Sequence, residues 1–182
     1  MSQIMNVLII YYSYTGNNEL LARELGRRLA APLHRIEEKG RRWGISIFLD
    51  LLFHRRPAIR RSHVQPELVE HVILVAPVWG GRIAGPMKTF LEQKAEKIRR
   101  YSFITLCGHV QNPDLETELE QLTGKKPLVI TQLPVEELLP PGDRGKVMKV
   151  SRYRAREAGL VAFERQLKDF MQAVVGAASL QT

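Results

Sequence analysis

Residues 6–29 read NVLIIYYSYTGNNELLARELGRRL, and this stretch decides the fold. Its first part, Asn6–Tyr12, is rich in Val, Ile and Tyr, a composition typical of a strand that is buried on both faces. The following part, Asn18–Ala30, carries leucine at every fourth position, and Glu24 stands four residues before Arg28. The pattern predicts a strand, a short polar loop and an amphipathic helix with a Glu24–Arg28 ion pair on its exposed side.

The alternation of apolar runs and helical patterns continues along the chain. Further strands are predicted at Pro32–Ile36, His71–Val78, Tyr101–Cys107 and Leu128–Leu133. Helices are predicted at Pro86–Arg99 and Pro113–Thr123, and a long closing helix is expected to include Tyr153, Val161, Leu167, Phe170, Met171 and Val174 among its apolar positions. Strands that alternate with helices form parallel βαβ units, so we expect an α/β fold: a three-layer doubly wound domain around a five-stranded parallel sheet.

The domain organisation that we expect is one domain over residues 1–182. No repeat or Gly/Ser linker divides the chain, and only an insert at about 39–63 is not needed to complete a βαβ unit. The amino-terminal residues show no leader pattern, and the longest apolar stretch, Ile45–Phe53, is far shorter than the ~20 residues of a membrane span. We therefore expect a soluble, cytoplasmic protein.

Several chemistries have no matching motif in the sequence. Cys107 is the one cysteine and the five histidines are scattered, so no metal-ligand spacing is present and no metal site is predicted. The glycine-rich signatures of P-loop and dinucleotide-binding proteins and the Gly-x-Ser-x-Gly motif are also missing. In a doubly wound sheet, ligands bind outside the carboxyl ends of the strands, so the loops at that edge are the places to look.

The first of these loops is Ser13-Tyr14-Thr15-Gly16-Asn17-Asn18. It combines two hydroxyl side chains, a glycine that tolerates a positive φ and two asparagines at a helix start. Free backbone N–H groups at a helix start bind phosphate without a cation, and the Ser13 and Thr15 hydroxyls add donors. The same residue types also suit a tight turn with an asparagine cap.

The second loop, Pro77-Val78-Trp79-Gly80-Gly81-Arg82, follows the most hydrophobic predicted strand. Trp79 offers a flat face for stacking, and the two glycines allow the backbone to approach a planar ligand closely. The alternative is a tryptophan that packs over a helix end beside a flexible turn. The third loop, Cys107-Gly108-His109-Val110-Gln111-Asn112, brings polar groups to the same edge. His109 is a candidate proton donor there, or simply a solvated side chain, and Cys107 an apolar strand-end residue.

Together these residues resemble the flavodoxin family of FMN-binding proteins. Ser13–Asn17 is similar to the phosphate loop of that family, and Pro77–Gly80 with Pro86–Leu91 is similar to its ring-contacting loop and the helix after it. Asn18 stands where the family usually has threonine, and the third loop lacks the usual acidic and aromatic pattern. The resemblance implies five parallel strands in the order 2-1-3-4-5, a single FMN at their carboxyl edge, and backbone near Gly80 and Gly81 against the reactive nitrogen of the ring. It also implies FMN contacts from all three loops: Ser13, Tyr14, Thr15, Gly16, Asn17, Asn18, Pro77, Val78, Trp79, Gly80, Gly81, Cys107, Gly108 and His109.

The insert is both basic and apolar. Arg41, Arg42, Arg55, Arg56, Arg60 and Arg61 flank the apolar stretch Gly44–Phe53, for which a helix is predicted. Four interpretations remain open: a helix that docks on its own domain, a homodimer surface over residues 43–56, a cover over the flavin, and an interfacial membrane helix. Docking and self-association are favoured over membrane contact, because so wide an apolar face is rarely left exposed.

The charge balance favours anionic partners. Lys and Arg number 27 against 19 Asp and Glu, a net charge of +8. By the resemblance, the leading hypothesis is an FMN-dependent electron carrier or small reductase. The positive charge favours a redox partner that is a small anionic or quinone-type acceptor or an acidic protein. The alternatives are a basic α/β module that binds nucleic acid or an acidic partner without flavin, and a phosphate-binding regulatory domain. Nucleic acid is disfavoured because the arginines do not interleave with aromatic residues on any predicted sheet face and no recognition motif is present.

Overall fold

The computed structural model describes residues 6–40, 56–108 and 112–179. Its strands are β1 (Val7–Tyr11), β2 (Leu33–Arg35), β3 (His71–Val75), β4 (Val78–Trp79), β5 (Arg82–Ile83), β6 (Tyr101–Cys107) and β7 (Ile130–Pro134). Its helices are α1 (Asn17–Leu29), α3 (Gly85–Lys94), α4 (Leu115–Thr123), α5 (Val147–Arg152), α6 (Glu157–Leu160) and α7 (Glu164–Ser179), with short 3-10 turns between several of them.

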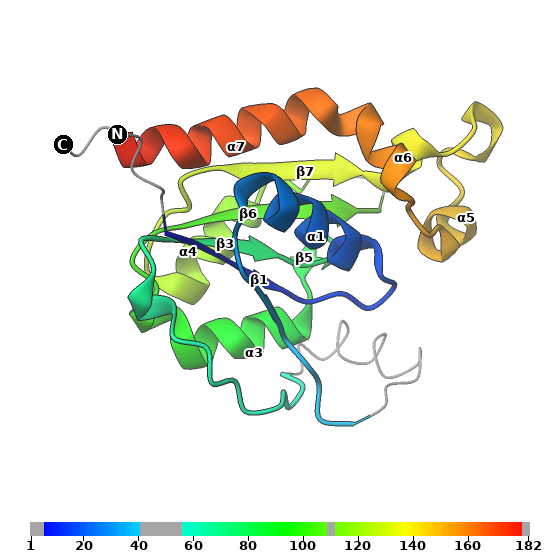
Figure 1. The fold of residues 1–182 in the computed structure, drawn as a ribbon. Coiled ribbons are helices and arrows are strands. Elements are labelled where there is room, and N and C mark those ends of the chain that lie inside the picture. The colour runs from blue at the N-terminus through cyan, green and yellow to red at the C-terminus, as the bar shows by residue number, and fades with distance from the viewer. Residues whose placement is uncertain (1–5, 41–55, 109–111, 180–182) are drawn as a thin grey trace.

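Five of the strands form one parallel sheet in the order β2-β1-β3-β6-β7 (Figure 1). Since β4 and β5 form a separate antiparallel hairpin, β6 and β7 are the fourth and fifth strands of this sheet. The predicted α/β doubly wound fold and the strand order 2-1-3-4-5 are therefore confirmed. The strand order reverses between β1 and β3, where the register pairs Tyr11 with Val75 at the carboxyl ends.

Alternate residues of each central strand face opposite helix layers. Ile9, Ile73 and Ile104 belong to the cluster that packs against α1 and α7. Ile10, Leu74 and Phe103 belong to the cluster that packs against α3 and α4. Burial on both faces explains why these strands lack a polar alternation in the sequence. The result is the expected three-layer arrangement, with a helix layer on each side of the sheet (Figure 1).

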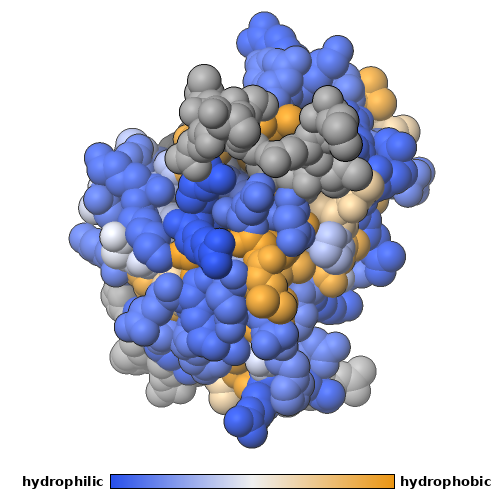
Figure 2. Space-filling view, turned by 60° about the vertical axis from the view of Figure 1, so that its left-hand side comes forward, coloured by the Kyte–Doolittle hydropathy of each residue, from blue (hydrophilic) through white to orange (hydrophobic). Residues whose placement is uncertain are grey.

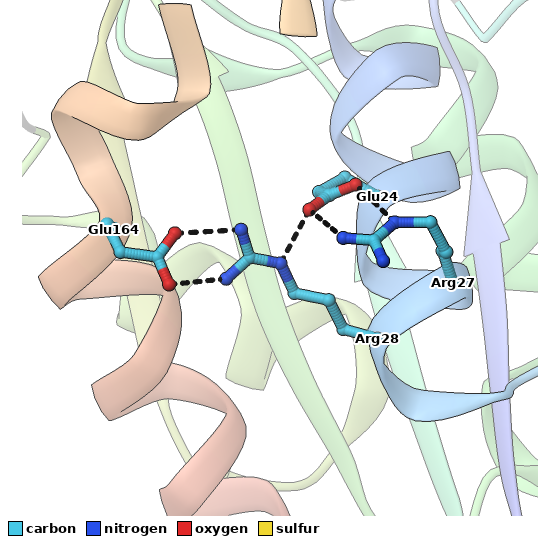
Figure 3. Close-up of polar contacts among 4 residues, drawn as sticks. All are labelled: Glu24, Arg27, Arg28 and Glu164. Carbon is cyan, nitrogen blue, oxygen red and sulfur yellow. Dashed lines mark hydrogen bonds and ion pairs between the residues drawn. The ribbon is translucent and has the colours of Figure 1, made fainter. Parts of the chain in front are cut away.

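Polar contacts fasten α1 to α7 on one face of the sheet (Figure 3). The Arg28 guanidinium binds both carboxylate oxygens of Glu164, at 2.8 and 2.7 Å, and its Nε donates to Glu24 at 2.6 Å. Arg27 donates to the same Glu24 carboxylate, and these hydrogen bonds lower the pKa of Glu24 to about 2. The predicted Glu24–Arg28 pair is confirmed, and it forms part of a network that also reaches the last helix.

The closing helix is the part of the secondary structure that was predicted wrongly. The chain passes through 3-10 turns after β7, forms the short helices α5 and α6, and only then enters α7. Tyr153 lies in the extended segment between α5 and α6, not inside a helix. Leu167, Phe170 and Val174 do line the buried face of α7, as their spacing predicts.

The two ends of the insert meet at its base. Glu38 and Ile59 form an antiparallel bridge, Lys39 N–H donates to the Ala58 carbonyl at 2.9 Å, and Arg60 N–H donates to the Glu37 carbonyl at 2.7 Å. Ile59 is buried in the core on the α3–α4 side of the sheet. The predicted helix, and with it most of the segment 43–56, lies outside the described residues.

Much of the surface is hydrophilic. Figure 2 brings forward the side on which the parallel strands begin, and there hydrophobic residues form a limited patch near the centre of the view. No helix of residues 6–40, 56–108 and 112–179 combines the length and the apolar character that crossing a membrane requires.

Candidate functional site at the carboxyl edge of the sheet

The first loop joins the end of β1 to the start of α1 in a tight turn. Gly16 has φ 91°, and its N–H donates to the Ser13 hydroxyl at 3.1 Å. No side chain caps α1. The first backbone N–H groups of a helix have no acceptor within it, so they face the space in front of the helix with the positive end of its dipole. A Cβ placed on Gly16 would meet no atom within 4 Å, which leaves that space open to a ligand.

The side chains of Asn17 and Asn18 bind the protein itself. Asn18 donates to the Leu106 carbonyl at 3.0 Å and accepts from the Leu106 N–H at 2.9 Å, which fastens α1 to β6. Asn17 makes the same reciprocal pair of bonds with the backbone of Tyr153 and Ala155. Both amides are buried, so these two residues offer a ligand only their backbone N–H groups. The amide at position 18 makes this reciprocal pair because its NH2 group donates while its separate carbonyl oxygen accepts.

The second loop is a β-hairpin and not the end of a sheet strand. Val78 and Trp79 pair with Ile83 and Arg82, and the two residues between them, Gly80 and Gly81, have φ values of 54° and 76°. Positive φ at both central positions defines a tight hairpin turn that glycine accommodates without strain. The turn presents exposed backbone at the carboxyl edge, and neither glycine has a Cβ of its own to block a ligand.

Trp79 joins the second loop to the first. Its half-buried ring meets the Tyr14 ring edge-on, with centroids 6.1 Å apart and planes at 90°, and it meets the Tyr12 ring at 6.3 Å and 83°. Such edge-to-face contacts are favourable arrangements for aromatic rings. The loops that begin at Ser13 and Pro77 are thus neighbours, although more than 60 residues separate them in the sequence.

Polar contacts from α3 and α4 brace the hairpin. Glu118 accepts a hydrogen bond from the Ile83 N–H at 3.0 Å and pairs with Lys88, whose side chain is nine-tenths buried. On the other side of the turn, the Asn112 amide donates to the Gly81 carbonyl. Sequence reasoning missed Lys88 and Glu118, since charged residues on predicted helices are ordinarily solvated.

The third loop reaches the same place from β6. Asn112 exchanges two hydrogen bonds with the Gln132 side chain of β7, at 2.8 and 3.0 Å, while its own amide holds the hairpin. Cys107 is buried, and burial raises the pKa of its thiol to about 11, so it stays protonated at neutral pH. His109 lies outside the described residues. Pro77 and Val78 are buried, and Gly108 is half-buried.

The segment after β7 completes this edge. Val150 of α5 comes within 3.7 Å of the position that a Cβ on Gly108 would occupy, and Asn17 holds the backbone at Tyr153 and Ala155. No motif in the sequence predicts this packing, although Pro140, Pro141, Gly142 and Gly145 before α5 are residues that end or exclude a helix. In chemical terms the edge offers an open helix start, an aromatic ring and exposed backbone side by side.

No family model matches the sequence, and no curated protein matches it. Solved structures do match the fold. A flavoprotein in complex with FMN from Lactobacillus acidophilus NCFM is 15% identical with a TM-score of 0.63, over 70% of this chain and 93% of that one. A protein from Bacteroides eggerthii DSM 20697 is 17% identical with a TM-score of 0.62, over 71% of this chain and 87% of that one.

A third match extends over nearly all of both chains. The flavodoxin, WrbA-like protein from Agrobacterium tumefaciens is 14% identical with a TM-score of 0.54, over 98% of this chain and 99% of that one. These identities are low, so the similarity that the TM-scores of 0.54 to 0.63 measure is one of fold. The chain has the flavodoxin-like fold.

Proposed function

We propose that the protein binds FMN at the carboxyl edge of the sheet and acts as an electron-transfer protein or small reductase. The observation that carries the proposal is the contact between Tyr14 and Trp79, which brings the polar first loop and the glycine hairpin together. FMN has a phosphate at one end and a planar ring at the other. The first loop is polar and begins a helix, which suits a phosphate, and the hairpin carries an aromatic ring and exposed backbone, which suit a planar ring. The neighbour from Lactobacillus acidophilus, which has this fold, is itself a complex with FMN.

The first loop is proposed to hold the phosphate. The uncapped start of α1 supplies backbone N–H groups and the positive end of the helix dipole. Thr15 is half-buried at the turn and adds a hydroxyl donor, whereas Ser13 Oγ already accepts from Gly16 and adds at most its hydroxyl hydrogen. The open space at Gly16 fits the phosphate group.

The hairpin is proposed to hold the ring. Trp79 supplies an aromatic face, and the exposed backbone of Gly80 and Gly81 lies where no Cβ blocks approach to the reactive edge. The flavin supplies the redox chemistry, taking up and giving back one or two electrons. The chain's contribution is to orient the ring, to shield one of its faces from water and to set the local charge.

Purification gives the first test. The protein is expected to be yellow, to release its colour on denaturation and to yield a molecule with the mass of FMN and not FAD. Anaerobic NADPH then separates two versions of the function, because a reductase bleaches and a carrier does not. A colourless protein that takes up no added FMN would contradict the proposal and favour the flavin-free alternatives.

Thr15→Ala tests the phosphate end. It is expected to weaken FMN binding about tenfold, equivalent to one hydrogen bond to a charged group, and to leave riboflavin binding unchanged. Thr117→Ala, at an exposed position on α4, is the matched control. Equal losses for FMN and riboflavin in the Thr15 variant would reject its role at the phosphate.

A further inference from the structure

A strongly basic strip, Arg144–Arg156, borders the carboxyl edge. It reads RGKVMKVSRYRAR, with six Lys or Arg residues and no Asp or Glu. It contains α5 and the extended residues that lead into α6, and most of its side chains are exposed. Much of the net charge of +8 is therefore concentrated in 13 consecutive residues.

Two contacts fix the strip beside the candidate site. At the middle of the strip, Val150 is buried and packs toward Gly108 of the third loop. Toward its carboxyl end, the Asn17 side chain donates to the Tyr153 carbonyl at 3.1 Å and accepts from the Ala155 N–H at 2.9 Å. The strip thus runs from the third loop to the start of α1, along the edge where the flavin is proposed to bind.

Three arginines of the strip have no carboxylate partner in the part of the chain that the structure describes. Lys146 and Lys149 share Asp143, at 3.0 and 3.9 Å. Across residues 6–40, 56–108 and 112–179, no ion pair involves Arg152, Arg154 or Arg156, and Arg154 donates only to backbone carbonyls within the strip. These three positive charges are solvated and open to an external anionic group.

Apolar side chains stand among these charges. Val147 and Met148 on α5 are 68% and 61% exposed. Two apolar residues within a rim of Lys and Arg are typical of a small transient protein interface, in which methionine is enriched at the centre. A membrane-binding helix instead needs a long apolar face, and α5 has six residues.

We propose that the basic strip is the docking surface for an acidic electron-transfer protein, an inference that rests on the proposed function. Charge complementarity steers such a partner to the strip, and docking there brings its redox centre to the edge that holds the flavin. In each productive encounter the reduced partner loses one electron and the bound flavin gains it. The electron acceptor within this chain is thus the flavin, and the partner leaves oxidised.

Charge reversal tests the strip. The variant Arg152→Glu/Arg154→Glu/Arg156→Glu is compared with Arg99→Glu/Arg165→Glu/Lys168→Glu, which changes the net charge equally at exposed positions outside the strip. The probe is a reduced, acidic plant-type [2Fe–2S] ferredoxin, mixed in stopped flow with the full-length protein loaded with FMN. At an ionic strength of about 0.1 M, charges farther than ~10 Å from the contact are largely screened.

The strip variant is expected to slow the second-order reduction of the flavin about 10-fold or more and to flatten its salt dependence. The control variant is expected to change this rate by about twofold at most, since its charges lie away from the contact. FMN content and the visible spectrum are expected to stay the same in both variants. Equal rates for the two variants would overturn the proposal.

A second measurement separates this proposal from the proposed function. Fluorescence anisotropy of labelled ferredoxin reports docking to the full chain whether or not flavin is bound. If the protein binds no FMN but still docks ferredoxin through the strip, the docking surface is supported and the proposed FMN binding is rejected. If the protein is yellow and the strip variant docks ferredoxin as well as the natural chain does, the docking surface is rejected and the proposed FMN binding stands.

Other anionic partners are outcomes of the same comparison. The two variants are tested for sedimentation with vesicles of phosphatidylserine and phosphatidylcholine and for binding to a short duplex DNA. Strip-dependent binding to either of these, without strip-dependent binding to ferredoxin, would overturn the assignment to an acidic protein.

Discussion

The two ends of the parallel sheet differ in the backbone groups that they leave open to a ligand. At the amino edge, polar groups satisfy one another: His71 pairs with Ser102 at 2.9 Å, and the Tyr101 hydroxyl donates to the Lys125 carbonyl at 2.8 Å and accepts from Thr123 at 3.0 Å. At the carboxyl edge, the start of α1 is uncapped, and the hairpin turn of Gly80 and Gly81 is exposed.

The difference indicates a division of roles within one sheet. A closed polar network adds stability, because each buried donor and acceptor has its partner. Backbone N–H and C=O groups without a hydrogen-bond partner in the protein add nothing to its stability, but they can bind a ligand. Substitutions at the amino edge are therefore expected to change unfolding without changing FMN binding, and substitutions that loosen the hairpin are expected to change FMN binding.

The largest effect is expected from His71 at acid pH. Burial, with a contribution from Arg100, lowers the pKa of His71 to about 4 from an ordinary 6.5. Between these values the unfolded chain binds a proton that the folded protein does not. The stabilising contribution is therefore complete above pH 6.5 and declines as the pH falls toward 4, by about 3 kcal/mol in total.

Urea unfolding at pH 7 and pH 4.5 measures this decline. Carboxylates also titrate in this range, so the variant His71→Gln, which does not titrate there, isolates the histidine. It is expected to lose less stability between the two pH values than the natural chain. An identical loss in both proteins would show that His71 is not the group responsible.

The next effect is expected at the brace of the hairpin. Glu118→Gln removes the charge that faces the buried Lys88 and weakens the acceptor for the Ile83 N–H. We expect a loss of about 2 kcal/mol in unfolding free energy, below the range for a fully buried pair because the amide still accepts a hydrogen bond. FMN binding is expected to weaken about tenfold, because the turn that presents Gly80 and Gly81 becomes less fixed.

Isothermal titration with FMN and urea unfolding measure the two losses of Glu118→Gln. Glu116→Gln, at an exposed neighbouring position on α4, serves as the control. Unchanged FMN affinity in Glu118→Gln would mean that the hairpin does not contribute to binding.

Tyr101→Phe tests whether the polar network at the amino edge contributes to stability and not to FMN binding. It removes one hydroxyl from the closed network and is expected to cost about 1 kcal/mol of unfolding free energy, with no change in FMN affinity. Tyr14→Phe is the matched control, since Tyr14 is exposed at the carboxyl edge and its ring remains. A loss of stability in Tyr14→Phe equal to that in Tyr101→Phe would contradict the division of roles.

The smallest effect is expected away from both edges, at the contact between α1 and α7. Arg28→Gln removes the bridge to Glu164 and is expected to cost at most about 1 kcal/mol, because the network is partly exposed to solvent. The loss should shrink in 1 M NaCl. Arg23→Gln, which removes a more exposed arginine, is expected to cost less. A larger loss in Arg23→Gln would mean that the bridge between the helices adds no stability.

The sequence predicts the sheet well because the strands are apolar runs and the helices have one apolar stripe. It also places the first loop and the Trp79 loop at one edge. Their convergence follows from the rule for parallel strands, and the Tyr14–Trp79 contact agrees with it. The role of each loop residue in FMN binding stays a prediction.

Other features depend on contacts between distant residues, which spacing alone does not reveal. The amides of Asn17 and Asn18 suit a helix cap or a phosphate site, yet they bind backbone at Tyr153 and Leu106. Tyr153 fits the apolar spacing of a closing helix, but Asn17 holds its backbone in an extended segment. The hairpin at Gly80 was not predicted, because its strands β4 and β5 have two residues each and give no pattern of their own beside the apolar run of β3.

The antiparallel bridge between Glu38 and Ile59 has a consequence for how this chain tolerates change. It closes the crossover from β2 to β3 at a fixed point, so the register of the sheet does not depend on how many residues lie beyond it. The entropy of closing a flexible loop grows slowly, by about 0.6 kcal/mol for each doubling of its length. Changes in the number of residues between Lys39 and Ala58 are therefore expected to leave the order and register of the sheet unchanged.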